Sequence, residues 1–172
     1  MGTAMQPTVT PFYHRPTGTW SYVVADPATR QAAVIDPVLD YDWRSGRTGT
    51  ASADTVLGHI AAEGLSLRWI LETHAHADHL SSAAYLQSRA GGRIAIGAGI
   101  RQVQATFKRI FGLGEEFVPD GRQFDRLLAD GDTIELGGIH GGVIATPGHT
   151  SDSVSYLFGD ALFVGDTVFM PD

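Results

Sequence analysis

The chain has 172 residues, of which 12 are basic and 19 acidic, so its formal net charge at pH 7 is −7. That length fits one domain, and residues 1–172 are predicted to form it. The acidic balance argues against a nucleic-acid partner, because such partners need a basic surface. The absence of cysteine excludes disulfides, thiolate metal ligands and a cysteine nucleophile.

The sequence contains no apolar run near eighteen residues and no secretory leader pattern. We therefore expect no membrane span or membrane partner, and a cytoplasmic location. Residues 1–4 precede a second methionine, Met5, and are interpreted as a remnant of cloning.

The first part of the chain predicts strands and then a helix. Short apolar or alternating runs favour strands at Pro11–Tyr13, Trp20–Ala25 and Ala32–Ile35. Asp36-Pro37 ends the third strand, and the run Asp40–Thr50 is predicted to be a polar loop. Ser52 or Asp54 can then cap a helix that ends near Glu63.

The rest of the chain alternates strands with helices and then becomes rich in glycine turns. The predicted strands and helices up to Gly112 are a buried strand at Leu67–Thr73, a helix at Leu80–Arg89, a strand at Arg93–Ile96 and a helix at Ile100–Phe111. Beyond Gly112 we expect strands at Thr133–Leu136 and Gly142–Thr146, and a hairpin of Ser153–Phe158 with Ala161–Val164.

The stretch Thr73-His74-Ala75-His76-Ala77-Asp78-His79 separates the buried strand from the helix that follows it. Strand ends of this kind carry the sites of open α/β sheets. Asp78 alone could simply cap a helix beginning at His79, and one histidine alone would more often be structural. Three imidazoles and a carboxylate within six residues are instead typical of a site for a divalent metal.

Two further stretches place ligand-type side chains after strands. They are Thr146-Pro147-Gly148-His149-Thr150 and Gly165-Asp166-Thr167. Each alone is ordinary turn chemistry. Together with the main motif they predict that three strand ends bring His74, His149 and Asp166 to a common rim.

The order H-x-H-x-D-H, T-P-G-H-T and G-D-T resembles the pattern of the metallo-β-lactamase superfamily. The resemblance covers essentially the whole chain and implies an α/β fold, a four-layer αββα sandwich with the metal site along one edge. Within the superfamily the chain looks most like persulfide dioxygenases related to glyoxalase II. That likeness is carried by residues 21–27, 71–80, 129–132 and 165–172.

The resemblance implies one Fe(II) per chain, held by His74, His149 and Asp166, and the oxidation of glutathione persulfide by dioxygen to sulfite and glutathione. His76, Asp78 and His79 would then lie behind the ligands or mark a remnant second metal position. Two-metal members need another histidine after the G-D-T aspartate, and here none follows His149. Two histidines and one carboxylate also match the facial triad of non-haem iron oxygenases.

Two alternatives stay open at this point. The same ligands could hold zinc and a bound hydroxide, giving a glyoxalase II-like thioester hydrolase. Alternatively, the chain could be an inactive metal-binding fragment or interaction module. Four other potential ligands, Asp132, His140, His14 and His59, are predicted to be structural.

The chain ends at Asp172, whereas members of the family continue beyond the third motif. We therefore expect an incomplete domain whose C-terminal part is missing. Apolar residues of Val154–Phe158 and Ala161–Val164 would then meet water, which predicts a marginally stable homo-oligomer that associates through residues 153–164 and has little activity.

Overall fold

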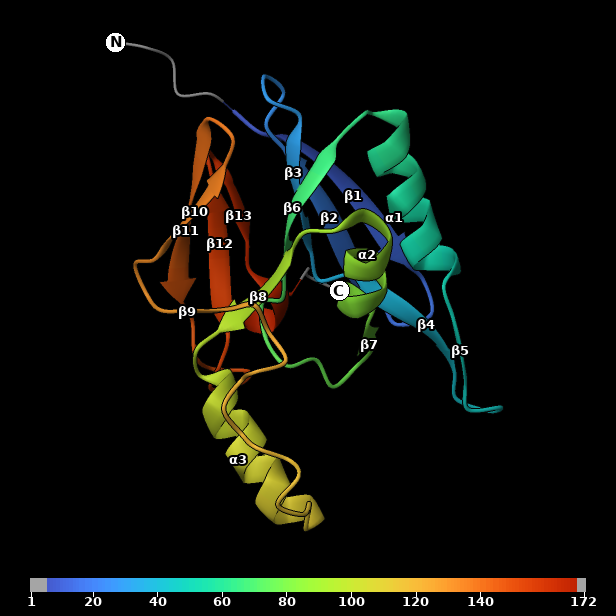
Figure 1. Ribbon diagram of the computed structural model, residues 1–172, viewed down its shortest axis with the longest axis vertical. Coiled ribbons are helices and arrows are strands. Elements are labelled where there is room, and N and C mark those ends of the chain that lie inside the picture. The colour runs from blue at the N-terminus through green and yellow to red at the C-terminus, as the bar shows by residue number, and fades with distance from the viewer. Residues whose placement is uncertain (1–5, 170–172) are drawn as a thin grey trace.

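The computed structural model describes residues 6–169, and the predicted cloning remnant at residues 1–4 lies outside this range. Two sheets face each other (Figure 1). The six-stranded sheet has the order β1 (Thr8–His14), β2 (Thr19–Ala25), β3 (Gln31–Ile35), β6 (Ser66–Leu71), β8 (Arg93–Gly97), β9 (Arg126–Leu128). The four-stranded sheet is an antiparallel meander of β10 (Thr133–Leu136), β11 (Ile139–Ala145), β12 (Val154–Phe158) and β13 (Ala161–Phe163).

The six-stranded sheet changes direction in its middle. Strands β1, β2 and β3 pair antiparallel, whereas β3, β6, β8 and β9 run parallel. A third, small sheet joins β5 (Arg47–Gly49), β4 (Val38–Asp42) and β7 (Leu80–Ser81). The parallel half matters for function, because its strands deliver their carboxyl ends to one rim.

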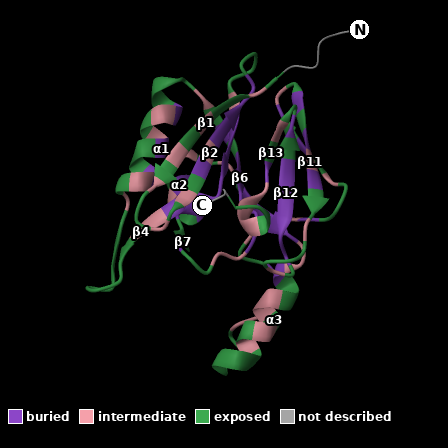
Figure 2. Ribbon diagram, turned by 180° about the vertical axis from the view of Figure 1, so that it is seen from behind, coloured by how far each residue is buried: buried purple, intermediate pink, exposed green. Residues whose placement is uncertain are grey.

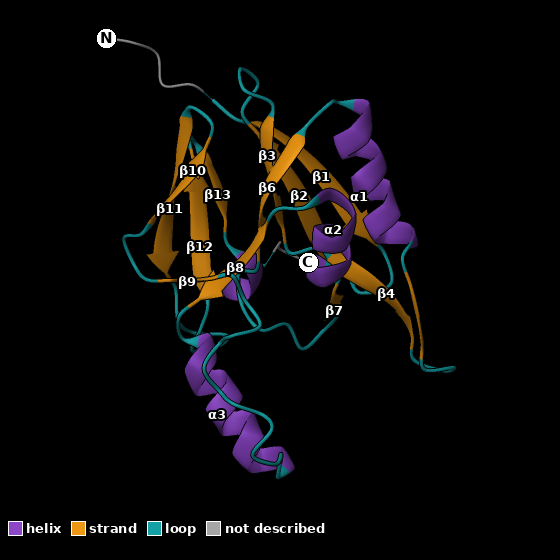
Figure 3. Cartoon of the chain, in the orientation of Figure 1, coloured by secondary structure: helices purple, strands orange, loops and turns teal. Residues whose placement is uncertain are grey.

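The three helices play different parts, as Figure 3 shows. α1 (Ala51–Ala62) and α2 (Ala83–Ala90) cover the outer face of the six-stranded sheet, whereas α3 (Ile100–Phe111) projects from the body. Within residues 6–169, no helix lies on the outer face of the four-stranded sheet. No helix in this range is both long and apolar enough to cross a membrane.

Successive side chains along each strand of the six-stranded sheet point to opposite faces, and this gives two hydrophobic layers. Val24, Ile35 and Leu71 face the second sheet, whereas Val23, Val34 and Ile70 face the two covering helices. The second sheet contributes Leu136, Tyr156, Phe158 and other fully buried side chains to the layer between the sheets. Figure 2 shows the resulting buried strands between exposed outer surfaces.

Most predicted elements are present, but several bounds differ from the prediction and some strands were missed. The helix expected from Leu80 begins at Ala83, with Ser82 and not Asp78 at its N-cap position, because Leu80–Ser81 pairs with β4. The predicted loop Asp40–Thr50 contains most of β4 and all of β5. Strand β9 was not predicted at all.

The sequence predicted that apolar residues of the last hairpin, β12 and β13, meet water. For the side chains that face the other sheet this prediction was wrong. Val154, Tyr156, Phe158 and Phe163 are all buried, and the exposed apolar residues are the outward-facing Leu157 and Leu162. Alternation therefore leaves only part of this sheet's apolar surface in contact with water.

A matched pair of leucines tests the position of the core. Leu136→Ala should lower the free energy of unfolding by about 2–5 kcal/mol, because Leu136 is fully buried between the sheets. Leu162 is 51% exposed, so Leu162→Ala should change it by less than about 0.5 kcal/mol. Urea denaturation of both variants gives the two values, and equal losses would contradict this account of the core.

Candidate metal centre

Three chain segments meet at one rim of the sandwich. The histidine motif follows β6, the loop carrying His149 follows β11, and Asp166 lies in a 3-10 turn, Gly165–Thr167, after β13. His74 Nε2 lies 3.8 Å from Asp166 Oδ2, and His149 Nε2 lies 3.4 Å from the same oxygen. The structure thus brings together the three side chains that the sequence pattern singled out.

The tautomer of His74 follows from its neighbours. Thr73 Oγ1 donates its only hydrogen to Asp36 Oδ2 at 2.8 Å, so it must accept a bond from His74 Nδ1 at 3.0 Å. Nδ1 therefore carries the proton, and Nε2 keeps a lone pair that is buried without a hydrogen-bond partner. Burial, helped by the charge of His76, lowers the pKa of His74 and keeps the ring neutral.

Unlike the neutral ring of His74, the ring of His76 is protonated and positively charged. Its Nε2 donates to Asp36 Oδ1 at 3.0 Å and lies 3.3 Å from Glu72 Oε2. Burial disfavours a charged ring, but Asp36 and then Glu72 more than offset this and raise the pKa of His76 to about 11. Without a metal, His76 is an imidazolium held between two buried carboxylates.

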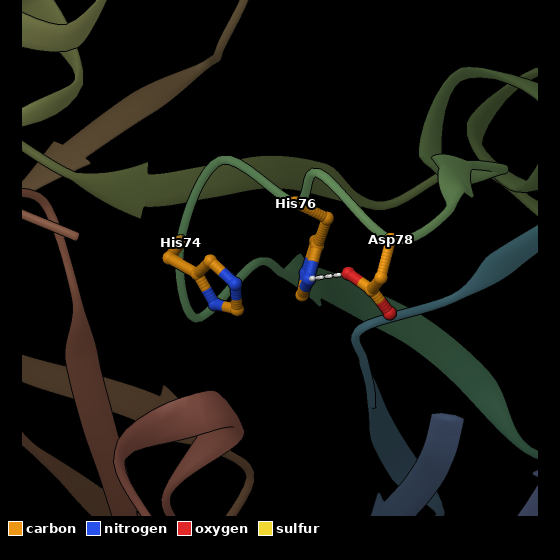
Figure 4. A group of neighbouring side chains, drawn as sticks. All are labelled: His74, His76 and Asp78. Carbon is orange, nitrogen blue, oxygen red and sulfur yellow. Dashed lines mark ion pairs between the residues drawn. The ribbon is translucent and has the colours of Figure 1, made fainter. Parts of the chain in front are cut away.

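His74 also belongs to a second group of potential ligands, with His76 and Asp78 (Figure 4). His76 Nδ1 lies 3.9 Å from Asp78 Oδ1. His79 Nδ1 bonds the other oxygen of Asp78 at 3.0 Å, while His79 Nε2 is buried without a partner. His76, Asp78 and His79 therefore lie beside the group of His74, His149 and Asp166. Hydrogen bonds and ion pairs join them to one another and to Asp36 and Glu72.

Sequence reasoning missed three carboxylates that hold this rim. Asp36 and Glu72 directly follow β3 and β6, and a carboxylate at the end of a buried strand was the signal that could have identified them. Asp152 Oδ2 accepts a hydrogen bond from the backbone N–H of Ala75 at 2.9 Å, and its Oδ1 is buried without a partner. These three residues fix the backbone and the charge of the motif.

The four residues predicted to be structural lie outside every candidate metal group found within residues 6–169. Asp132 accepts bonds from Ala129 N–H and Arg126, and His140 is exposed on β11. His14 pairs with Asp40 at 3.3 Å, and the ring of His59 packs edge-on against Phe12.

The spacing of His74, His149 and Asp166, called the first group below, suits one metal ion. Metal–ligand bonds of about 2.1 Å place neighbouring ligand atoms roughly 3.0–3.4 Å apart, close to the observed 3.4 and 3.8 Å. The buried lone pair of His74 offers an inner ligand. The His149 and Asp166 side chains are 39% and 27% exposed, so small molecules can reach the other side.

Two facing sheets with a His/Asp cluster at the carboxyl ends of their strands define a metallohydrolase-type fold. The chain belongs to the metallo-β-lactamase superfamily, whose sequence profile matches residues 14–172. The expected metallo-β-lactamase fold and the metal-binding character of the rim are therefore confirmed. Of the expected four layers, residues 6–169 supply both sheets and the helices that cover the six-stranded sheet, but no helical layer on the four-stranded sheet.

The chain is similar to two relatives of known sequence and to one solved structure. A probable metallo-hydrolase of Burkholderia pseudomallei is 49% identical, covering 96% of this chain and 60% of that protein. A hydroxyacylglutathione hydrolase of Acidiphilium cryptum is 41% identical, covering 76% and 49%. The crystal structure of ETHE1 from Myxococcus xanthus matches with a TM-score of 0.71 at 29% identity, covering 95% and 59%. The chain thus spans about half the length of these relatives.

The bond between Thr73 and His74 can be tested directly. Thr73→Val removes the hydroxyl that accepts from Nδ1, so it should weaken divalent-metal binding about 10–100-fold, the usual effect of losing such a supporting bond. Thr73→Ser keeps the hydroxyl and should bind within a few-fold of wild type. Metal titration gives the affinities, and ¹⁵N NMR of the ring nitrogens should show Nδ1 protonated in wild type. An Nε2-protonated ring would contradict the assignment.

The raised pKa of His76 predicts how stability depends on pH in the metal-free chain. Its value of about 11 exceeds the ordinary 6.5, so the folded state holds a proton that the unfolded state releases. The stabilisation is fully present below about pH 6.5 and is lost as the pH rises toward 11, by at most about 1.4 kcal/mol per pH unit.

Denaturant unfolding between pH 7 and 10, with a chelator present, measures this slope. His76→Gln should flatten the decline, whereas His140→Gln, on an exposed strand position, should leave it unchanged. Equal slopes in wild type and His76→Gln would rule out a buried imidazolium.

Proposed function

We propose that this chain carries the metal centre of a mononuclear iron persulfide dioxygenase. In this proposal His74, His149 and Asp166 bind one Fe(II), and glutathione persulfide is the substrate. The observation that carries it is the meeting of His74 Nε2, His149 Nε2 and Asp166 Oδ2 around one point, with the His74 lone pair buried and unpartnered. Two imidazoles and one carboxylate are the facial triad of non-haem iron oxygenases.

The charge of His76 supports a single metal. A ring must lose its proton before it can bind a metal at that nitrogen, and the two carboxylates around His76 oppose that loss. His74, in contrast, is already neutral and has Nε2 free. His74 is therefore already in its binding state, whereas His76 must first release its Nδ1 proton before it can bind a metal there.

In this proposal the metal ion and the protein have different roles in the reaction. Bound iron supplies the redox capacity, and the net reaction converts the persulfide, dioxygen and water into glutathione, sulfite and two protons. The protein holds His74 from the buried side through Thr73 and Asp36. It leaves His149 and Asp166 at the exposed side, where a small substrate can approach. The substrate itself is proposed from the family resemblance of the motifs, and the cytoplasmic location expected from the sequence stays a prediction.

A glyoxalase II-like zinc thioester hydrolase is the second candidate. The group of His74, His76 and Asp78 favours it, because His76 could bind through Nδ1 while Nε2–H donates to Asp36. The relative from Acidiphilium cryptum is named for hydrolysing hydroxyacylglutathione. The two candidates therefore differ in the metal, in the role of His76 and in the substrate.

Single substitutions separate the two ligand sets. In the proposed iron site His74→Ala, His149→Ala and Asp166→Ala should each remove most bound metal, while His76→Ala should retain part of it. His140→Ala, at an exposed strand position, should match wild type and serves as the control. Elemental analysis of purified protein gives the metal content, and wild-type content in His149→Ala would refute the ligand assignment.

Activity then identifies the reaction. Oxygen uptake and sulfite release on glutathione persulfide with iron bound would support the proposal, and substitution of any ligand should abolish both. Hydrolysis of a hydroxyacylglutathione thioester with zinc bound, without oxygen uptake, would support the hydrolase instead. Bound metal with neither activity would identify the chain as an inactive metal-binding fragment and overturn both enzyme proposals.

A further inference from the structure

A cavity of about 340 Å³ lies between the edge strand β1, strand β4 and the two covering helices. Its lining includes Phe12 of β1, Val38 of β4, Val56 of α1 and Ser82 at the start of α2. The volume lies within the range of roughly 300–1,000 Å³ that is typical of small-molecule sites. None of the proposed metal ligands lines this cavity, so it is separate from the metal centre.

The lining offers a charged ligand no counter-ion. Within residues 6–169 it contains no lysine, arginine, aspartate or glutamate. His14 lines the cavity, but both of its ring nitrogens already have partners, because Nδ1 lies 2.7 Å from Thr17 Oγ1 and Nε2 lies 3.3 Å from Asp40 Oδ1. A charged ligand would lose its water there without gaining an opposite charge, which is costly. The cavity therefore suits an uncharged molecule.

Three hydroxyl groups of the lining already donate their hydrogen to other parts of the protein. Ser21 Oγ donates to a backbone carbonyl and Ser52 Oγ donates to Asp40 Oδ1, both at 2.6 Å. Thr55 Oγ1 donates to a carbonyl of its own helix at 2.9 Å. Because a hydroxyl has a single hydrogen, these three side chains offer a ligand only their lone pairs.

Ser82 differs from them because its hydroxyl has no partner. The residue is 1% exposed, and its Oγ makes no hydrogen bond within residues 6–169. Although Ser82 occupies the N-cap position of α2, its side chain makes no capping bond, and Ser81 Oγ accepts from the N–H of Ala83 instead. A buried hydroxyl without a partner costs free energy. Since no bond holds this hydroxyl, it can turn toward a ligand and donate to an acceptor atom.

We propose that this cavity binds a small uncharged molecule that is mostly apolar and carries one acceptor oxygen, such as a carbonyl. The oxygen takes the hydrogen bond of Ser82, and the apolar part packs against Phe12 and Val56. The cavity also touches Pro37, whose carbonyl accepts from the N–H of Ser82 at 2.9 Å. The ligand therefore reaches the residue next to Asp36 without approaching the metal ligands, and its binding needs no metal.

Two aromatic probes of equal size test this chemistry in the full 172-residue chain. Acetophenone is neutral and carries one carbonyl oxygen, whereas benzoate has as many heavy atoms and a negative charge. With a chelator present, acetophenone should shift the ¹H–¹⁵N NMR signals of Val38, Val56 and Ser82, with a dissociation constant of the order of 1 mM. Benzoate should bind about tenfold more weakly or not at all. No saturable binding of acetophenone, equal affinities for the two probes, or shifts centred on the metal rim would overturn the proposal.

Three variants test the position of the ligand. Ser82→Ala should weaken acetophenone binding about three- to tenfold. It should not lower the free energy of unfolding of the free chain, because the lost hydroxyl has no partner there. Ser88→Ala removes an exposed hydroxyl from the same helix and should bind within about twofold of wild type. Ala53→Leu places a larger side chain in the lining and should abolish binding, while cooperative urea unfolding shows that the fold is kept. Wild-type affinity in Ser82→Ala or in Ala53→Leu would overturn the proposal.

Discussion

The buried carboxylate of Asp36 joins the sheet to the metal rim. Its two oxygens accept hydrogen bonds from Thr73 N–H at 2.7 Å, Thr73 Oγ1 at 2.8 Å and His76 Nε2 at 3.0 Å. Burial alone would raise the pKa of Asp36, but the charge of His76 and these hydrogen bonds keep it below its ordinary value. One charge therefore fixes the turn after β6, the tautomer of His74 and the protonation of His76.

The backbone at Asp36 and at Gly165 has the conformation that their contacts with Thr73 require. Asp36 adopts φ +47°, a left-handed conformation that costs a non-glycine residue roughly 1–2 kcal/mol, and the hydrogen bonds of its carboxylate hold it there. Gly165 faces Thr73 so closely that a Cβ would collide with the threonine hydroxyl. The glycine before Asp166 is thus needed because the segment after β13 must approach the same threonine that orients His74.

The sequence predicted the parts of the structure that depend on local patterns. The histidine motif, His149 and Asp166 follow strands, and strand ends meet at a rim, so their convergence was foreseeable. Leu80 has helical spacing with Ala83 and Ala84, yet it lies in β7, because pairing with β4 overrides local periodicity. Asp36 resembled a turn residue, because its partner His76 lies 40 positions away, and Glu72 was counted as part of the strand Leu67–Thr73. The end of a buried strand was the local signal for both carboxylates, whereas the partner of Asp36 left no local pattern.

His74 belongs to two of the candidate ligand groups, one with His149 and Asp166 and one with His76 and Asp78. Because its Nδ1 carries a proton, its Nε2 lone pair can bind only one ion at a time. A metal in one group therefore excludes a metal in the other. If iron binds the first group and zinc the second, as in the two proposed functions, the two ions compete for the same chain even though their other ligands differ. The identity of the bound metal would then follow the relative supply of the two ions during folding. Excess zinc would then inhibit the proposed iron-dependent reaction by competing with iron and not with the substrate.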